Sequence, residues 1–164
     1  MNSRSPYNII LAEDDPDDRH VFSMAIKETF GQANITGFDN GQSVIHSLLS
    51  NTSTNCDVLF LDINMPRMNG IDCLREIKDH IQFSRIPIVM LTTSSTKEDV
   101  MDTFYAGATR FITKPPTYKE LLNLFTQVYN LMRDGKLRKT DLFNYVMKPE
   151  AQAAVSVNRQ LIVA

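Results

Sequence analysis

The sequence predicts an α/β fold, a doubly wound, five-stranded parallel sheet with helices on both faces. Short apolar runs of strand length alternate five times with longer segments that have helical periodicity. This alternation is typical of parallel strands joined by right-handed helical crossovers. The composition fits one domain, because 164 residues of which 43% are hydrophobic can form one core.

The central strand is expected at residues 58–61, an apolar run that leads directly into Asp62. An unbroken apolar run is typical of a strand that is buried on both faces of its sheet. Asp62 is then the first polar side chain beyond the carboxyl end, the edge at which open α/β sheets bind ligands. Pro66 and Gly70 are expected to shape the turn into the following helix.

The first strand is expected at residues 8–12, and five carboxylates lie within the next six positions, 13–18. Asp15 is the expected cap of the first helix, with Pro16 at its first position. The helix runs to about Phe30, and Gly31 ends it. Its inward side is predicted from spacing to contain Val21, Met24, Ala25 and Glu28, with Phe22 and Ile26 widening the apolar face.

The other elements follow the same rules of periodicity and capping. Strands are expected at 35–38, 86–91 and 108–113, and helices at about 44–49, 70–80, from Ser95 or Thr96 to Tyr105, and from Thr117 to about Met132.

Four of the five predicted strands deliver polar side chains to one edge of the sheet. These side chains are Glu13 and Asp14, Asp62, Thr92 and Lys114. Carboxylates that share a site repel one another unless a cation lies among them, and oxygen ligands favour a hard ion such as Mg²⁺. With such a metal bound, Asp62 could accept a phosphoryl group as an acyl phosphate, while Lys114 and Thr92 contact the phosphoryl oxygens.

These motifs resemble those of the receiver domains of two-component response regulators. The resemblance covers about Tyr7 to Met132 and rests on Glu13-Asp14, on Asp62 to Pro66 with Gly70, on Thr92, and on Lys114-Pro115. It implies a flavodoxin-like strand order of 2-1-3-4-5. The start of the first helix also resembles stand-alone receivers associated with phytochrome-type kinases, some of which carry C-terminal arms.

The resemblance implies a role for each residue of the edge. Asp62 is the expected phosphoacceptor, and Asp14, Asp62 and the main-chain carbonyl of Asn64 are the expected Mg²⁺ ligands, with Glu13 acting through water. Thr92 and Lys114 are expected to sense the phosphoryl group. Phe111 occupies the position of the family's switch aromatic, and the output face is expected at about Thr96 to Met132, the fourth helix, fifth strand and fifth helix. A cis bond is implied after Lys114, although a second proline, Pro116, departs from the pattern.

The implied function is a signalling switch of a two-component system and not an enzyme that acts on other substrates. It would take its phosphoryl group from a sensor histidine kinase or a histidine phosphotransfer protein and signal through altered protein binding. An alternative is a phosphorelay intermediate that passes the group on to a histidine phosphotransfer protein. A phosphatase with an aspartyl nucleophile is disfavoured, because such enzymes need a second aspartate where this chain has Asn64.

The expected division is an extension at 1–6, the receiver domain at 7–132 and a tail at 133–164. The tail is too short for a separate output domain, which predicts a single-domain regulator. An amphipathic helix is expected from Thr140 to Met147, with Leu142, Phe143, Tyr145 and Val146 as its apolar residues, and it would serve as a docking or dimerisation arm. A net charge of −2 gives no reason to expect binding to nucleic acid or membranes. Without a signal peptide or a membrane span, the expected location is the cytoplasm.

Overall fold

The computed structural model describes residues 5–50, 55–138 and 140–150. Its strands are β1 (Tyr7–Ala12), β2 (Ala33–Phe38), β3 (Val58–Leu61), β4 (Ile88–Thr92), β5 (Arg110–Thr113) and β6 (Val146–Met147). Its helices are α1 (Pro16–Phe30), α2 (Gly41–Ser50), α3 (Gly70–Asp79), α4 (Lys97–Tyr105), α5 (Tyr118–Arg133) and α6 (Leu142–Tyr145). None of these helices has both the length and the apolar character that crossing a membrane requires.

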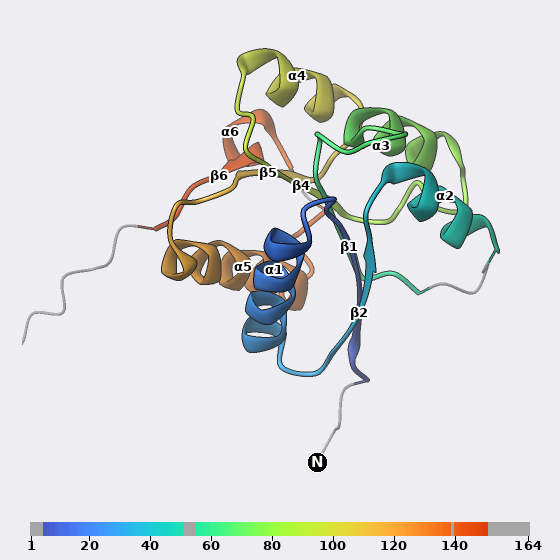
Figure 1. Cartoon of the computed structure of the whole chain (residues 1–164). Coiled ribbons are helices and arrows are strands. Elements are labelled where there is room, and N and C mark those ends of the chain that lie inside the picture. The colour runs from blue at the N-terminus through green and yellow to red at the C-terminus, as the bar shows by residue number, and fades with distance from the viewer. Residues whose placement is uncertain (1–4, 51–54, 139, 151–164) are drawn as a thin grey trace, which may run out of the picture.

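The strands form one parallel sheet in the order β2-β1-β3-β4-β5-β6, which confirms the predicted fold class and strand order (Figure 1). The predicted count of five strands is wrong, because the short strand β6 from the tail adds a sixth at the edge beside β5. All four residues of β3 are buried, as the unbroken apolar run predicted.

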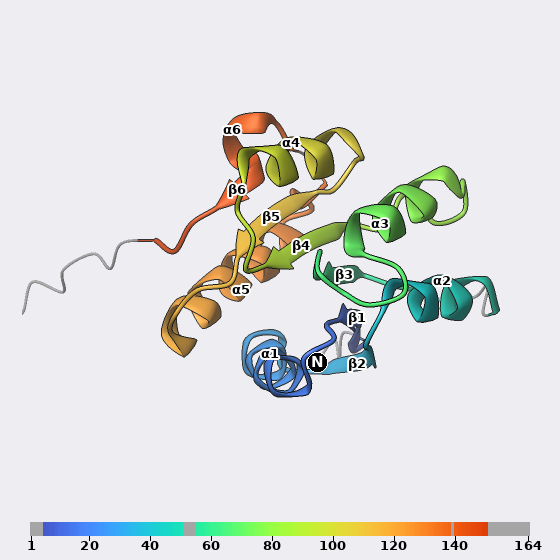
Figure 2. The same cartoon turned by 45° about the horizontal axis from the view of Figure 1, so that its top comes forward.

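Helices cover both faces of the sheet, and each face has its own core (Figure 2). Helices α2, α3 and α4 lie on one face, while α1 and α5 pack side by side on the other. The predicted inward side of α1 is wrong at three positions, since Val21 is 39% and Met24 50% exposed and Glu28 is exposed as well. The buried side of α1 is instead lined by Phe22, Ala25, Ile26 and Phe30.

Two local features of the chain shape the loops at the carboxyl edge of the sheet, where the predicted polar residues lie. Asp15 caps α1 as predicted, because its carboxylate accepts hydrogen bonds from the backbone N–H groups of Asp17 and Asp18 at 2.8 and 3.0 Å. Gly70 opens α3 directly beneath the end of β3, where a Cβ would lie 2.0 Å from the carbonyl oxygen of Asp62. Only glycine can therefore occupy position 70 while the loop after Asp62 keeps this path.

The tail folds back onto the domain as an arm, residues 140–150. The predicted helix from Thr140 to Met147 is wrong in length, because only α6 is helical and the chain then extends into β6. Tyr145 is fully buried against the α4 side of the sheet, whereas Met147 joins the core on the α5 side. The arm therefore wraps around the edge of the sheet at β5. The rest of the predicted tail, residues 151–164, lies outside the described residues.

Candidate functional site

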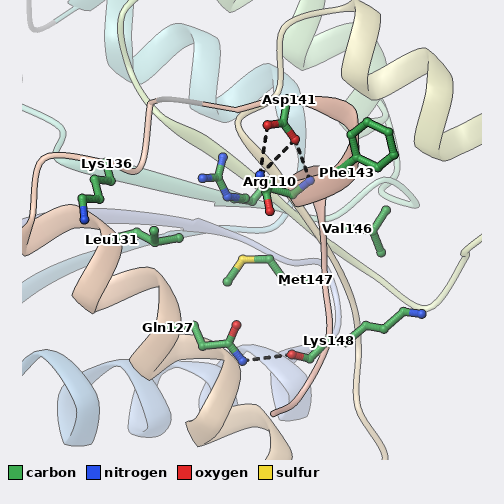
Figure 3. A pocket seen from close by; sticks show the side chains of 10 residues that line it. Arg110, Gln127, Leu131, Lys136, Asp141, Phe143, Val146, Met147 and Lys148 are labelled. Atoms are coloured by element: carbon green, nitrogen blue, oxygen red, sulfur yellow. Dashed lines mark hydrogen bonds between the residues drawn. The ribbon is translucent and has the colours of Figure 1, made fainter.

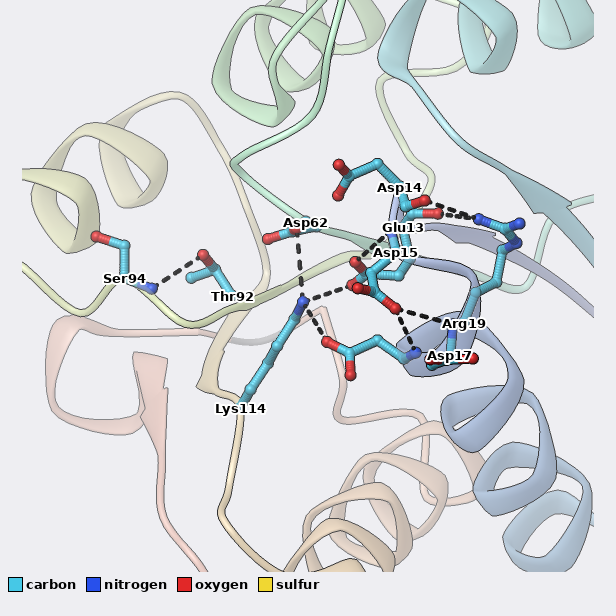
Figure 4. A network of polar contacts seen from close by, with 10 residues as sticks. Glu13, Asp14, Asp15, Asp17, Arg19, Asp62, Thr92, Ser94 and Lys114 are labelled. Atoms are coloured by element: carbon cyan, nitrogen blue, oxygen red, sulfur yellow. Dashed lines mark hydrogen bonds and ion pairs between the residues drawn. The ribbon is translucent and has the colours of Figure 1, made fainter.

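The strand register brings the predicted polar residues to one edge of the sheet (Figure 4). Ala12 pairs with Leu61, so Glu13 and Asp62 leave their strands side by side, and the Asp62 N–H donates to the Ala12 carbonyl at 3.0 Å. Thr92 is the last residue of β4, and the N–H of Lys114 donates to its carbonyl at 2.8 Å. The parallel register thus gathers these groups, as expected for strands whose carboxyl ends share one edge.

The ammonium of Lys114 lies among three carboxylates. Its Nζ atom is 2.6 Å from Oε2 of Glu13, 3.1 Å from Oδ2 of Asp18 and 3.6 Å from Oδ2 of Asp62. The side chains of Lys114, Glu13 and Asp62 are at most 10% exposed, so water screens the ion pairs among them weakly, whereas Asp18 is 45% exposed. Without a metal, Lys114 is thus the positive charge that offsets the buried carboxylates of Glu13 and Asp62.

Asp18 is a member of the site that the sequence did not reveal. Asp17 and Asp18 both have the appearance of acidic residues in the first turn of a helix, but only Asp18, which is half-exposed, forms an ion pair with Lys114. The cap at Asp15 places the first turn of α1 at the sheet edge, where the Asp18 carboxylate reaches Lys114. The register of the cap was therefore the signal that could have identified this contact.

The Arg19 side chain of α1 holds the two main-chain carbonyl groups that follow β1. Nη1 of Arg19 donates to the carbonyl of Glu13 at 2.6 Å and lies 3.4 Å from the carbonyl of Asp14 (Figure 4). The loop that presents these two carboxylates is thereby tied to α1.

Glu13, Asp14 and Asp62 are arranged to hold a metal ion. One carboxylate oxygen from each lies within 4.8 Å of the others. Oδ1 of Asp62 is buried and has no hydrogen-bond partner among the described residues, so it has a free position for a ligand. An oxygen-only set with one buried, unpartnered oxygen fits a hard divalent cation. Asn64 is an exposed residue of the loop that follows β3, and its main-chain carbonyl as a fourth ligand stays a prediction.

Burial changes the proton affinity of the acidic groups. It raises the pKa of Glu13 to about 7, with the charge of Asp62 adding to the rise and Lys114 opposing it. Burial also raises the pKa of Asp62, and the Lys114 ammonium again acts in the opposite direction. The metal-free site therefore holds its protons more tightly than free carboxylates do.

A stability measurement tests this prediction for Glu13. Its pKa is about 7 in the folded protein against an ordinary value of 4.5, so between these pH values the folded state binds more protons than the unfolded state. The free energy of unfolding of the metal-free protein should fall as the pH rises from about 4.5 to 7, by about 3 kcal/mol at most. Urea unfolding at several pH values measures this fall. Glu13→Gln should flatten it, and Mg²⁺ should reverse it because the metal binds the ionised form. An equal slope in the metal-free wild type and variant would contradict the assignment.

Thr92 and Phe111 lie in the sheet on the output side. Thr92 is fully buried, and its hydroxyl oxygen accepts a hydrogen bond from the N–H of Ser94 at 3.2 Å, which leaves the hydroxyl proton available to donate. Phe111 is fully buried in β5, with its ring 6.1 Å from the ring of Tyr145 in the arm. The sensing role of Thr92 and the switching role of Phe111 stay predictions.

Tyr145 fills the space between β5 and α4. Its ring lies edge-on to Phe104 at 5.1 Å, and its hydroxyl hydrogen-bonds the Thr103 hydroxyl at 2.8 Å. The arm thus covers part of the predicted output face.

The expectation of a cis bond after Lys114 is wrong, since the described residues contain no cis peptide bond.

A separate hollow lies between α5 and the arm (Figure 3). Its lining includes Arg110, Lys136, Asp141 and Lys148, and Gln127 crosses from α5 to hydrogen-bond the Lys148 carbonyl at 2.9 Å. Arg110 begins β5, whereas Lys114 follows its other end, so this hollow lies away from the acidic edge.

Fold and site together define a doubly wound α/β domain with an acidic, lysine-containing site at the carboxyl edge of its parallel sheet. The family model described as "Response regulator receiver domain" matches residues 9–126, and the chain belongs to this family. Receiver domains are signalling switches that interact with sensor histidine kinases and bind Mg²⁺ or Mn²⁺ in an acidic pocket.

Curated relatives and solved structures agree with the family. "Chemotaxis protein CheY1" of Helicobacter pylori is 34% identical over 104 residues, which cover 62% of this chain and 82% of that protein. "Response regulator Rcp1" of Synechocystis sp. is 27% identical over 126 residues, or 74% of this chain and 86% of that protein. The crystal structure of the phosphorylated cyanobacterial phytochrome response regulator RcpA shares the fold at a TM-score of 0.73 and 22% identity, covering 80% of this chain and 96% of RcpA. The receiver domain from Rhodospirillum rubrum has a TM-score of 0.70 at 27% identity, covering 77% and 94%.

Proposed function

We propose that this protein is a response regulator that accepts a phosphoryl group on Asp62 from a phosphohistidine of a sensor kinase. The observation that carries the proposal is the unpartnered, buried Oδ1 atom of Asp62 among the carboxylates of Glu13 and Asp14 and the ammonium of Lys114. In the transfer, the Asp62 oxygen forms a bond to phosphorus. The phosphorus–nitrogen bond of the donor breaks, and its electron pair stays on the histidine ring.

Glu13, Asp14 and Asp62 would hold Mg²⁺ together with the Asn64 carbonyl, with Glu13 acting through a water molecule. When bound, the ion supplies positive charge to the phosphoryl oxygens. The chain's own residues do the rest: Asp62 presents its oxygen, the Lys114 ammonium and the Thr92 hydroxyl face the incoming group, and Gly70 allows the close path of the loop. Phosphoryl transfer depends mainly on such positioning and charge.

The signal would leave through the α4–β5–α5 face. Thr92 ends β4 and Lys114 follows β5, and these are the two strands that border α4. Movement of either residue toward a phosphoryl group would therefore reach this face first. Several polar contacts tie the arm there, among them Thr140 to the Thr109 carbonyl at 2.7 Å, Tyr145 to Thr103, and Glu150 to Asn123 at 2.9 Å. We therefore place the arm within the output surface, for a downstream protein or for a second copy of the chain in a homodimer.

The proposal is tested by incubating the protein with a small phosphodonor and Mg²⁺ and measuring its intact mass. One added phosphoryl group is expected, and removal of Mg²⁺ should abolish the gain because the carboxylates would then repel the anionic donor. No gain with Mg²⁺ present would contradict the proposal. Transfer from the phosphorylated protein back to a histidine phosphotransfer domain would favour the phosphorelay alternative over a terminal switch.

A further inference from the structure

Asp18 is a partner of Lys114 that lies outside the group of metal ligands. Its Oδ2 atom is 3.1 Å from Nζ of Lys114, closer than the 3.6 Å that separates this ammonium from Asp62. Glu13 and Asp62 both belong to the metal cluster, whereas Asp18 does not. Asp18 is therefore the one of these three carboxylates that stays free to hold Lys114 when a metal engages the other two.

The element that carries Asp18 is well fixed. The Asp15 carboxylate caps α1 through the N–H of Asp18 itself. One turn further along, Phe22 is 5% exposed and packs edge-on against Phe125 of α5 at 6.5 Å. Nζ of Lys114 lies 5.4 Å from the centre of the Phe22 ring, a distance at which the ring attracts a cation. Helix α1 thus offers the ammonium a carboxylate and an aromatic face.

These contacts place Lys114 between two competing positions. A phosphoryl group on Asp62 would add negative charge at the end of β3 and attract the ammonium. Asp18 attracts the same ammonium toward α1. Because Lys114 has one charge to share, any approach to the phosphoryl group weakens its pair with Asp18.

We propose that Asp18 is a positioning residue that competes with the phosphoryl-bearing Asp62 for Lys114 and so lowers the affinity of the site for the phosphoryl group. This inference rests on the proposed function. It assigns a regulatory contact to the first turn of α1, and the contact acts through Lys114 and not through the metal.

Asp17 is a matched control for Asp18. It lies in the same helical turn and carries the same charge, yet it is exposed and none of the ion pairs of the described residues involves it. Asp17→Asn and Asp18→Asn therefore remove equal charge and equal favourable interaction with the helix dipole. Only Asp18→Asn releases Lys114.

The test is a titration of the full chain with beryllofluoride, a mimic of the phosphoryl group, at saturating Mg²⁺ and followed by fluorine NMR. Asp18→Asn should bind about two- to fivefold more tightly than Asp17→Asn, which corresponds to the strength of a partly exposed ion pair. In a Lys114→Ala background the two variants should bind equally, because the competition acts through the ammonium. Affinity for Mg²⁺ alone should also be equal in both.

Equal beryllofluoride affinity of Asp18→Asn and Asp17→Asn in the otherwise wild-type chain would overturn the inference. A gain that persists in the Lys114→Ala background would also overturn it, since it would show simple repulsion of the anion. If Lys114→Ala binds too weakly to titrate, the first comparison decides alone. Failure of the wild type to bind beryllofluoride, or equal binding by Asp62→Asn, would instead refute the proposed function and this inference with it.

Discussion

Lys114→Ala is expected to leave Asp62 able to accept a phosphoryl group but to uncouple that event from α4, β5 and α5. Lys114 contacts the group without forming a bond to it, so its loss removes the response more than the reaction. Removing the ammonium also leaves Glu13 and Asp62 buried without a counter-charge. The free energy of unfolding of the metal-free protein should fall by about 3 kcal/mol at pH 8 and by less at pH 5, where the carboxylates take up protons.

Amide chemical shifts across residues 96–133, recorded before and after phosphorylation, measure the response. A full wild-type response in Lys114→Ala would contradict the role of Lys114. Lys119→Ala is the control, because this lysine is exposed on α5. Lys114→Arg should restore function only in part, since a planar guanidinium does not replace a compact ammonium that contacts several oxygens.

Tyr145→Ala is expected to lower the free energy of unfolding by about 3–5 kcal/mol, the usual cost of deleting a buried aromatic ring. The ring is fully buried between Phe104 and Phe111, and its hydroxyl is bonded to Thr103. Phe143→Ala is the matched control from the same short helix, because Phe143 is 96% exposed and its loss should change stability by less than about 0.5 kcal/mol. Urea unfolding of both variants makes the comparison. Equal, small effects would show that the arm does not dock on the domain in solution.

A chain that ends at Asp134 extends this test to the whole arm. The acidic edge lies entirely within residues 7–132, so the shortened chain should still fold and still gain a phosphoryl group on Asp62. It should lose amide-exchange protection in β5 and α5, which the arm contacts. Sedimentation of both chains tests the proposed homodimer. If the shortened and full chains match in both protection and association state, the arm has neither role.

The strands of the sheet and the polar residues at its carboxyl edge could be predicted, because both depend on local sequence patterns. Apolar runs identify strands, parallel strands share their carboxyl edge, and Asp62 follows a run whose four residues are all buried. The strand order came from the family resemblance and not from periodicity, because periodicity does not specify which strands are neighbours.

The errors arose where tertiary packing decides. Val21 and Met24 have helical spacing, but α1 turns a different side inward because Phe22 and Phe30 pack on the rings of Phe125 and Phe60. Residues 140–147 were predicted as one helix, yet the last two of them, Val146 and Met147, pair with the open edge of β5 as strand β6. Asp18 looked like any acidic residue of a first turn. The predicted cap at Asp15 sets where that turn begins, but the contact with Lys114 also depends on how α1 packs on the sheet.

The most direct test of the central claim, that Asp62 is the phosphoacceptor, is the intact mass of three chains after incubation with a small phosphodonor and Mg²⁺. The wild type and Asp57→Asn should each gain one phosphoryl group. Asp57 is a fitting control, because it precedes β3 as an exposed aspartate whose oxygen accepts the Asn8 N–H at 2.8 Å, a bond that asparagine can keep. Asp62→Asn should gain none. A gain by Asp62→Asn at the wild-type rate would contradict the account.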